Sequence, residues 1–407
     1  MKSMYPALYG LPHEVKFCKK CVISNQRPNS AVEMKNRNNK KETIRFNEDG
    51  ICSACAYNER KDQIDWKQRE ETLFALLEEY RSTDGSYDVL VPSSGGKDSA
   101  FTAHLLKYKY GMNPLAVTWA PNIPTESGWE NFNSLSRIGG IDSLLYTPNG
   151  KLHSLITRLA FINLGHPFQP FIHGQKIIGP KLAHKFGIRL IMYGENQAEY
   201  GNPIDENNDP FMQPKFFSID DPMDMIFGGM SVREIMDKYD FTINDFSSYL
   251  PPSTEAITKS GIRVSYLGYF EKWDSQECYY YAVENTGFKP AFERSNGTYS
   301  RYAEIDDKMI HFHFYLTYIK FGIGRTTYDS SQEVRNNKIT REEAAYLVSK
   351  YDGEFPDKYL DDFCEYIGIC TDEFYRFVDS FRSPHLWGKV NGVWKLRHTV
   401  NKTGIDD

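Results

Sequence analysis

The sequence has no long uninterrupted apolar run. A membrane-spanning helix needs about 18 such residues, and the most apolar stretch, 310–323, is shorter and contains His311, His313 and Lys320. The first residues, 1–6, have none of the apolar character of a secretory signal. We therefore expect a cytoplasmic protein without membrane insertion.

A strong charge of either sign is also missing. The formal net charge is −6 over 407 residues, which disfavours a general polyanion binder and makes nucleic acid an unfavoured partner. Basic residues gather only between His13 and Arg45, where nine Lys or Arg stand against three Glu. That patch suits RNA or an acidic partner protein, and equally a solvated loop beside a metal site.

Cysteine is scarce, yet four of the seven cysteines form two CxxC pairs: Cys18, Cys21, Cys52 and Cys55. Two such pairs are typical of one tetrahedral Zn²⁺ held by four thiolates. The 30 residues between the pairs exceed the usual spacing, but they are mostly polar and can form an excursion. Disulfides are the weaker alternative in a cytosolic chain. A closed four-thiolate site serves folding and docking rather than catalysis.

The segment 93–99, SSGGKDS, carries the strongest chemical signal. It follows the apolar run 87–91 and opens an amphipathic helical segment. A strand that turns through two glycines into a helix makes an anion site, because free backbone N–H groups and the positive end of the helix dipole converge there. The hydroxyls of Ser94 and Ser99 and the ammonium of Lys97 suit a phosphate. A simple strand-to-helix connection is the plainer alternative.

The negative charge of Asp98 would repel a phosphate. We therefore expect Asp98 to hold a hard cation such as Mg²⁺ that bridges to the phosphates. The loop is not a Walker A motif, because Val91 and Asp98 stand where that motif needs Gly and Ser or Thr. The string SGGKDS instead resembles the pyrophosphate loop of the ATP pyrophosphatases. That resemblance implies an ATP site built from Ser93, Ser94, Gly95, Gly96, Lys97, Asp98 and Ser99.

Short apolar runs alternate with helical segments from residue 87 onward. We expect strands at 87–91, 115–119, 141–147 and 188–193, a later strand at 261–270, and helices at 98–110, 126–138, 151–164 and 175–186. Gly111, Gly139 and Gly187 stand where helix C-caps belong. The alternation predicts an α/β fold whose parallel sheet has helices on both faces.

Ligands of such sheets bind outside the carboxyl ends of the strands. The segments 93–99, 119–122, 148–150 and 194–197 should therefore rim one crevice. Resemblance to folds with this loop implies adenine near Thr118 and Trp119, with Gly194 in the nucleotide site, although Trp119 is equally suited to the core. Glu195 and Asn196 stand at the mouth, where a general base or ammonia-orienting group is useful. A turn stabilised by Asn196 is the alternative.

Beyond residue 200 the pattern is less regular. The segment 200–230 suits a lid, a partner-facing loop or a disordered stretch. Lys320 and Arg325 lie beside glycines, as in a second phosphate clamp or at an ordinary helix end. A capping box at 340–343 opens a helical region that ends in a hairpin with an Asn-Gly turn. We predict a zinc module at 1–68, a catalytic domain at 69–335 and a C-terminal helical region at 336–407.

Seven sequence motifs together indicate one family. They are the paired CxxC, SGGKDS, YGENxxEYG, LGYFEKWDSQE, DDKMIHFHFYLTYIKFGIGR, ITREEA and YDGEFP. In order and spacing they resemble the N-acetyl sugar amidotransferases, pyrophosphatase-loop enzymes of bacterial surface-sugar biosynthesis, over nearly the whole chain. The resemblance implies an adenine nucleotide alpha-hydrolase-like domain, an N-terminal four-cysteine zinc module, and ATP, Mg²⁺ and Zn²⁺ as cofactors.

The resemblance also implies an AMP-forming carbon–nitrogen ligase. ATP adenylates the amide oxygen of an N-acetyl group on a nucleotide-linked sugar, and ammonia then replaces AMP to give an acetamidino sugar for lipopolysaccharide O-antigen or another glycan. In that scheme Lys97 and Asp98 act on the departing pyrophosphate and Glu195 deprotonates or positions ammonia. Lys320 and Arg325 stabilise the adenylate. The sequence does not distinguish UDP from CMP as the carrier.

Ammonia needs a source. An N-terminal nucleophile glutaminase would expose a cysteine after removal of Met1, but Lys2 stands there, and no remaining segment suits a separate glutaminase domain. We therefore expect a partner subunit that hydrolyses glutamine, as the resembling family uses.

Two other functions share these features. A tRNA thiolation enzyme uses the same adenylation chemistry, but it needs reactive cysteines near the ATP crevice. The cysteines outside the zinc set lie far along the chain from the loop, and we expect buried or incidental thiols there: Cys278, Cys364 and Cys370. A non-catalytic nucleotide-binding scaffold built on the zinc module is the third reading, which the intact SGGKDS loop disfavours.

Overall fold

The centre of the protein is a five-stranded parallel sheet. The computed structural model describes residues 5–30, 34–35, 40, 42–202 and 209–406, and its sheet has the strand order β3-β2-β1-β4-β7. The strands are β1 (Val89–Pro92), β2 (Pro114–Trp119), β3 (Asp142–Tyr146), β4 (Leu190–Tyr193) and β7 (Arg263–Tyr266). Leu90 lies opposite Leu115 on one side and Ile191 on the other. The predicted α/β fold is confirmed.

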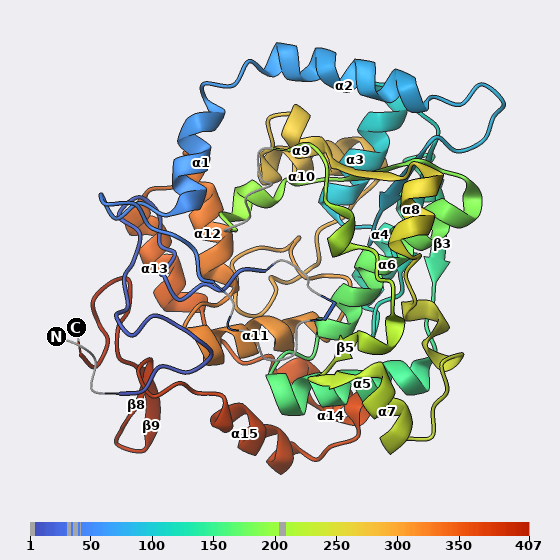
Figure 1. Cartoon of the computed structure of the whole chain (residues 1–407). Helices are drawn as coiled ribbons and strands as arrows, with labels where there is room; N and C mark the ends of the chain where they lie inside the picture. The colour runs from blue at the N-terminus through green and yellow to red at the C-terminus, as the bar shows by residue number, and fades with distance from the viewer. Residues whose placement is uncertain (1–4, 31–33, 36–39, 41, 203–208, 407) are drawn as a thin grey trace.

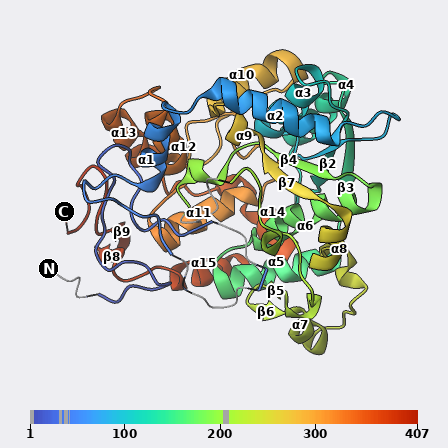
Figure 2. The same ribbon diagram turned by 45° about the horizontal axis from the view of Figure 1, so that its top comes forward.

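Helices cover both faces of the sheet (Figures 1 and 2). Val89 and Val91 share a core with α2 (Trp66–Tyr80), α3 (Lys97–Tyr108) and α10 (Ser275–Thr286). Leu90, between them, belongs to the core of the opposite face with α5 (Gly150–Leu164) and α6 (Gln169–Phe186). Because successive strand residues point to opposite faces, a strand buried on both sides is apolar throughout.

The remaining elements surround this unit. They are α1 (Ser53–Lys61), α4 (Glu126–Arg137), β5 (Ile226–Phe227), β6 (Met230–Ser231), α7 (Val232–Lys238), α8 (Thr254–Ser260), α9 (Leu267–Phe270), α11 (Ile310–Phe321), α12 (Arg325–Arg335), α13 (Arg341–Tyr351), α14 (Leu360–Ile367), α15 (Thr371–Ser380), β8 (Trp387–Val390) and β9 (Val393–Leu396), with short 3₁₀ turns between them such as η1 (Gln197–Tyr200). After α4 the left-handed glycine is Gly140, not the predicted Gly139.

Strand β7 is shorter than predicted. The extended chain ends at Tyr266 and α9 follows at once, because the backbone must approach the end of β4 closely. The Gly268 N–H donates to the Gly194 carbonyl at 2.8 Å. A Cβ on Gly268 would lie 3.2 Å from the Asn196 nitrogen. The turn that carries Glu195 is therefore fixed by a neighbouring glycine.

The C-terminal region has the predicted helices, capping box and hairpin. Thr340 accepts a hydrogen bond from the Glu343 N–H at 3.2 Å. The β8–β9 turn has φ +52 at Asn391 and +81 at Gly392, as a type I′ turn requires. Rings of α14 and α15 pack on Phe161 of α5, so this region shares a core with the sheet domain. The boundaries at 68 and 335 stay predictions.

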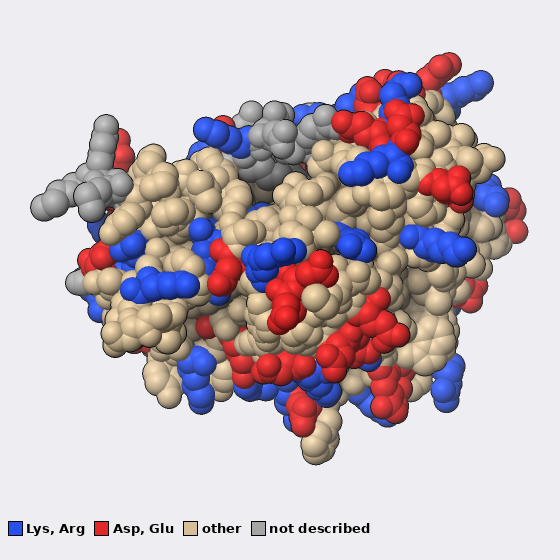
Figure 3. Space-filling view, turned by 90° about the horizontal axis from the view of Figure 1, so that it is seen from below, with Lys and Arg blue, Asp and Glu red and all other residues tan. Residues whose placement is uncertain are grey.

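Part of the segment 200–230 is packed into the core. Phe217, Met225 and Phe227 are buried there. Residues 203–208 lie outside the described residues, so a lid at that place stays a prediction. Within the described ranges no helix is long and apolar enough to cross a membrane. On the face shown in Figure 3, Lys and Arg are scattered among Asp and Glu, and that face has no broad basic area.

Candidate active site

The loop between β1 and α3 is ordered by its own serine hydroxyls. Ser93 Oγ accepts a hydrogen bond from the Gly95 N–H at 3.1 Å and donates one to Ser99 Oγ at 3.0 Å. Ser94 Oγ accepts from the Gly96 N–H at 3.3 Å. Gly96 is the N-cap of α3 and offers no side-chain cap, so the first N–H groups of the helix stay available at the loop. This arrangement suits an anion.

Gly95 is required where the loop passes α4. Its φ is +80, and a Cβ there would lie 2.8 Å from the backbone of Phe132. We expect Gly95→Ala to weaken ATP binding at least about 10-fold, because the strain and the clash displace the loop. Gly85→Ala is the matched control, since Gly85 has φ +85 with nothing within 4 Å. Equal ATP affinities for the two variants in calorimetry contradict this role of Gly95.

Lys97 and Asp98 open α3 and pair with each other, with Lys97 Nζ 2.5 Å from Asp98 Oδ2. Burial lowers the pKa of Lys97, but the negative charges around it, Asp98 foremost, outweigh that effect and raise it. The lysine therefore stays cationic. The second oxygen of Asp98, Oδ1, is buried without a hydrogen-bond partner. An unpaired carboxylate oxygen beside a phosphate loop fits Mg²⁺, which takes oxygen ligands.

Glu195 is the second residue after β4 and accepts a hydrogen bond from the Tyr200 hydroxyl. Burial, reinforced by the charge of Asp98, raises the pKa of Glu195 to about 8, against the opposing charges of Lys97 and Arg325. A carboxyl group that titrates near neutral pH can accept a proton from a nucleophile and release it again.

A second charged cluster surrounds Arg325 at the start of α12. Its Nε lies 3.1 Å from Glu304 Oε1 and 2.8 Å from Asp329 Oδ1, and its guanidinium covers the Phe314 ring. The Glu304 side chain is 1 % exposed, and burial raises the pKa of Glu304 well above its ordinary value. Glu304 also has φ +57, a conformation that is uncommon for a residue with a side chain. Sequence reasoning missed Glu304 and Asp329, since nothing local marks them.

Lys320 projects from the last turn of α11. Its Nζ donates to the Leu164 carbonyl at 2.6 Å and lies over the rings of Tyr9 and Phe321. Lys320 also lines the cavity described below.

One cavity of about 970 Å³ joins these groups. Among its lining residues are eight that the sequence predicts for the site: Ser94, Gly95, Gly96, Lys97, Asp98, Glu195, Lys320 and Arg325. The loop after β1 and the turn after β4 flank the point where the strand order reverses. Open α/β sheets bind their ligands at such a point.

The other predicted site residues do not line this cavity: Ser93, Ser99, Thr118, Trp119 and Gly194. The two serines support the loop, as described above. Trp119 is 2 % exposed, and its ring lies 5.0 Å from that of Tyr249. A Cβ on Gly174 would lie 2.2 Å from the indole, so α6 packs directly on it. Adenine binding near Thr118 and Trp119 stays a prediction, as do the segments 119–122 and 148–150 as parts of the rim.

Cys278 lies nearer the loop than its place in the sequence suggests. It belongs to α10, which packs on α3, and the charges of Asp98, Lys97 and Glu195 act on its thiol. Burial comes first among the causes that raise the pKa of Cys278 well above its ordinary value. Sequence distance is a poor guide for this residue, but a buried protonated thiol is a poor nucleophile and still disfavours thiolation chemistry.

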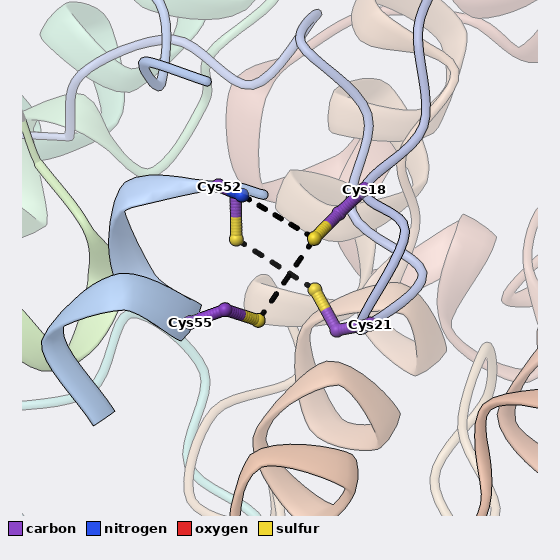
Figure 4. A group of neighbouring side chains, drawn as sticks. All are labelled: Cys18, Cys21, Cys52 and Cys55. Carbon is purple, nitrogen blue, oxygen red and sulfur yellow. Dashed lines mark hydrogen bonds between the residues drawn. The ribbon is translucent and has the colours of Figure 1, made fainter. Parts of the chain in front are cut away.

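The four predicted metal ligands come together in one buried group (Figure 4). Cys18 and Cys21 approach from a loop, and Cys52 and Cys55 from the start of α1. Their sulfur atoms all lie within 4.8 Å of one another. Arg341 at the start of α13 donates to the carbonyls of Cys18 and Cys21, each at 3.2 Å. The four-cysteine metal-binding group predicted from the sequence is confirmed.

A buried ion pair connects this metal centre to the turn that carries Glu195. Lys61 at the end of α1 lies 2.7 Å from Glu199 Oε1 in η1, and the two side chains are 1 % and 4 % exposed. Lys61 also donates to the Trp273 carbonyl at 2.9 Å. On the same helix, Ser53 donates to the Gly201 carbonyl at 2.8 Å. Helix α1 thus holds the chain just after Glu195.

We expect Lys61→Met to lower the free energy of unfolding by about 3–5 kcal/mol, because it leaves a buried carboxylate unpaired. Denaturant unfolding measures the loss. The double variant Lys61→Met with Glu199→Leu should recover much of it, since no uncompensated charge remains. A loss of stability below about 1 kcal/mol for the single variant is typical of a solvent-exposed ion pair and would contradict the burial of this one.

Part of the chain that lines the cavity is similar to a known protein family. Residues 296–401 match the family model described as LPS biosynthesis protein WbpG-like, C-terminal domain. This part of the chain is similar to that C-terminal domain. Glu304, Lys320, Arg325 and Asp329 all fall within the matched residues, whereas the phosphate loop precedes them. The match confirms the predicted resemblance to proteins of surface-sugar biosynthesis.

No curated protein matches the chain. Solved structures give distant similarities. The U34-tRNA thiolase NcsA from Methanococcus maripaludis, with its [4Fe-4S] cluster, is 12% identical over 83% of this chain and 89% of its own, with a TM-score of 0.30. NMN synthetase from Francisella tularensis is 13% identical over 49% of this chain and 93% of its own, with a TM-score of 0.23. Both TM-scores are too low to carry a conclusion about function.

Proposed function

We propose that this chain is an ATP-dependent, AMP-forming amidotransferase that converts the N-acetyl group of a nucleotide-linked sugar into an acetamidino group. One observation carries the proposal. A single cavity brings together a phosphate loop, a carboxyl group that titrates near neutral pH and an arginine of the WbpG-like domain. These groups suit the three tasks of the reaction: release of pyrophosphate, proton transfer and stabilisation of an adenylate.

The first step activates a poor electrophile. The amide oxygen of the substrate attacks the α-phosphorus of ATP, and the bond from that phosphorus to the oxygen it shares with the β-phosphate breaks. Pyrophosphate leaves with the electron pair. Lys97 and the N-terminal N–H groups of α3 stabilise the charge that develops on it. Asp98 would hold Mg²⁺, which neutralises phosphate charge when bound.

The second step exchanges oxygen for nitrogen. Ammonia adds to the activated carbon, Glu195 accepts a proton from it, and AMP leaves with the former amide oxygen. Arg325 faces the AMP phosphate in this scheme, with Lys320 as a second cation. Glu304 and Asp329 act as positioning residues, because both carboxylates lie within ion-pair distance of Arg325 Nε.

This role of Glu195 predicts a pH dependence. Only the deprotonated carboxylate accepts a proton, and burial raises the pKa of Glu195 to about 8. The rate at a fixed concentration of free ammonia should therefore fall as the pH drops below that value. Glu195→Gln should be slower and should lose this limb of the profile. A wild-type rate that stays constant between about pH 6 and 9 contradicts the assignment.

The four-cysteine centre is proposed to hold Zn²⁺. A tetrahedral ion with Zn–S bonds of about 2.3 Å separates its sulfurs by about 3.8 Å. Cys18 Sγ lies 3.9 Å from Cys55 Sγ, and Cys21 Sγ lies 3.8 Å from Cys52 Sγ. This spacing suits one ion shared by four sulfurs.

Ammonia is proposed to come from a separate glutaminase subunit, with both proteins in the cytoplasm. The purified chain should then make product from ammonium but not from glutamine. Full activity with glutamine and no other protein contradicts the need for that subunit.

The proposed function is tested by mass spectrometry of products. Nucleotide-linked diacetamido sugars are incubated with the purified chain, ATP, Mg²⁺ and ammonium. We expect a sugar product lighter than its parent by the difference between O and NH, together with one AMP and one pyrophosphate per product. Absence of AMP with every such sugar contradicts the proposal and favours a non-catalytic nucleotide-binding protein.

A further inference from the structure

Arg27 is a buried cation whose guanidinium is only partly hydrogen-bonded. The residue is 3 % exposed. Its Nη2 donates to Asn202 Oδ1 at 3.2 Å and to Ser30 Oγ at 3.4 Å, and its guanidinium lies over the Tyr328 ring. Nη1 is buried and has no hydrogen-bond partner. Over the described ranges, no carboxylate forms an ion pair with Arg27.

Such an arginine is costly unless something else supplies the negative charge. Burial lowers the pKa of Arg27, and the positive charge of Arg335 lowers it further. The phenol of Tyr328, which also hydrogen-bonds to Arg27, and the thiol of Cys52 oppose these effects. An arginine remains charged even so, because its ordinary pKa is very high. A buried charge is expected to be paired, and the missing partner of Nη1 points to a ligand.

Arg27 faces the cavity that contains the phosphate loop. Ser30, Tyr328 and Arg335 line the same cavity around it. At about 970 Å³ the cavity stands at the upper end of the range of about 300–1,000 Å³ for sites of single small ligands. A reaction between ATP and a second nucleotide needs that room.

We propose that Arg27 binds a phosphate of the nucleotide that carries the sugar. The planar guanidinium matches a phosphate and gains a partner for Nη1. The loop after β1 already accounts for the outer phosphates of ATP. The identity of the ligand as the sugar carrier rests on the proposed function, whereas the phosphate site itself rests on Arg27.

Calorimetric titration tests the site with three probes: UDP, CMP and ATP, each with Mg²⁺. The wild type should bind UDP or CMP. Arg27→Met should bind that nucleotide about 10- to 100-fold more weakly, because one charge-assisted contact is lost. Its affinity for ATP should stay within about twofold of the wild type. Arg376→Met is the matched control, since Arg376 is an exposed arginine of α15.

Arg27→Gln is the second variant, because an amide can keep a hydrogen bond to Asn202 without the charge. Unchanged UDP and CMP affinities in a folded variant overturn the proposal, as does a wild type that binds neither. Loss of ATP affinity with UDP and CMP affinity retained assigns the phosphate to ATP and also overturns it. These titrations require no turnover. A failure to form acetamidino product therefore refutes the proposed function alone, and leaves the phosphate site standing.

Discussion

Asp98→Asn lowers kcat/KM for pyrophosphate release by about 10²- to 10³-fold. Two effects combine in this expectation. The variant loses a negative ligand for Mg²⁺ at a buried oxygen that has no other partner. It also removes the carboxylate that lies 2.5 Å from the Lys97 ammonium. A coupled assay for pyrophosphate, run over a series of Mg²⁺ concentrations, measures both the rate and the metal requirement.

The control for this variant is Asp142→Asn. Asp142 lies in the edge strand β3 and accepts a hydrogen bond from the Tyr87 hydroxyl at 2.8 Å, remote from the lining of the cavity. It should keep the wild-type rate. If Asp98→Asn matches the control in rate and in Mg²⁺ dependence while remaining folded, Asp98 does not hold the metal.

Cys52→Ser removes one of the four metal ligands and should destabilise the protein by at least about 3 kcal/mol, because the binding energy of a structural ion is also folding energy. The substitution should also disturb the turn that carries Glu195. Helix α1 begins next to Cys52 and holds η1 through Lys61 and Glu199, just after Glu195. Elemental analysis should find about one Zn²⁺ in each wild-type chain and none in the variant, and denaturant unfolding gives the loss of stability.

Cys370→Ser is the matched cysteine control, since Cys370 is exposed and belongs to no metal-binding group among the described residues. It should keep both metal and stability. A Cys52→Ser protein that unfolds at the wild-type denaturant concentration would show that the centre contributes nothing to folding.

The β1–α3 loop and the four-cysteine group were predictable because their sequence signals are local. In the loop, glycines, serines and a lysine stand within seven consecutive residues between a strand and a helix. The CxxC spacing likewise places two sulfurs of each pair on one short turn. The parallel sheet followed from apolar runs separated by helical segments, since each run must be buried on both faces.

The rest of the cavity depended on tertiary packing. Glu304 and Asp329 reach Arg325 from an irregular loop and from the next turn of α12, and neither stands in a recognisable motif. Arg27 was only one of nine basic residues in a segment whose burial no pattern revealed. Cys278 was judged by its distance along the chain, although α10 packs on α3. Burial creates the unusual electrostatics of these residues, and burial is a property of the whole fold.

Residues 296–401, which are similar to the WbpG-like C-terminal domain, do more than follow the sheet in the sequence. They contribute Arg325, Glu304 and Asp329 to the cavity that the β1–α3 loop also lines. Two separate regions of the chain therefore line the cavity, and the β1–α3 loop alone does not define it.

The most direct test of the proposed chemistry is an isotope-transfer measurement. The oxygen of the N-acetyl group is labelled with a heavy isotope, and the sugar nucleotide is turned over with ATP, Mg²⁺ and ammonium. If the amide oxygen attacks the α-phosphorus, the label appears in AMP and not in pyrophosphate or water. Unlabelled AMP, or label retained in the sugar while AMP forms, contradicts the account.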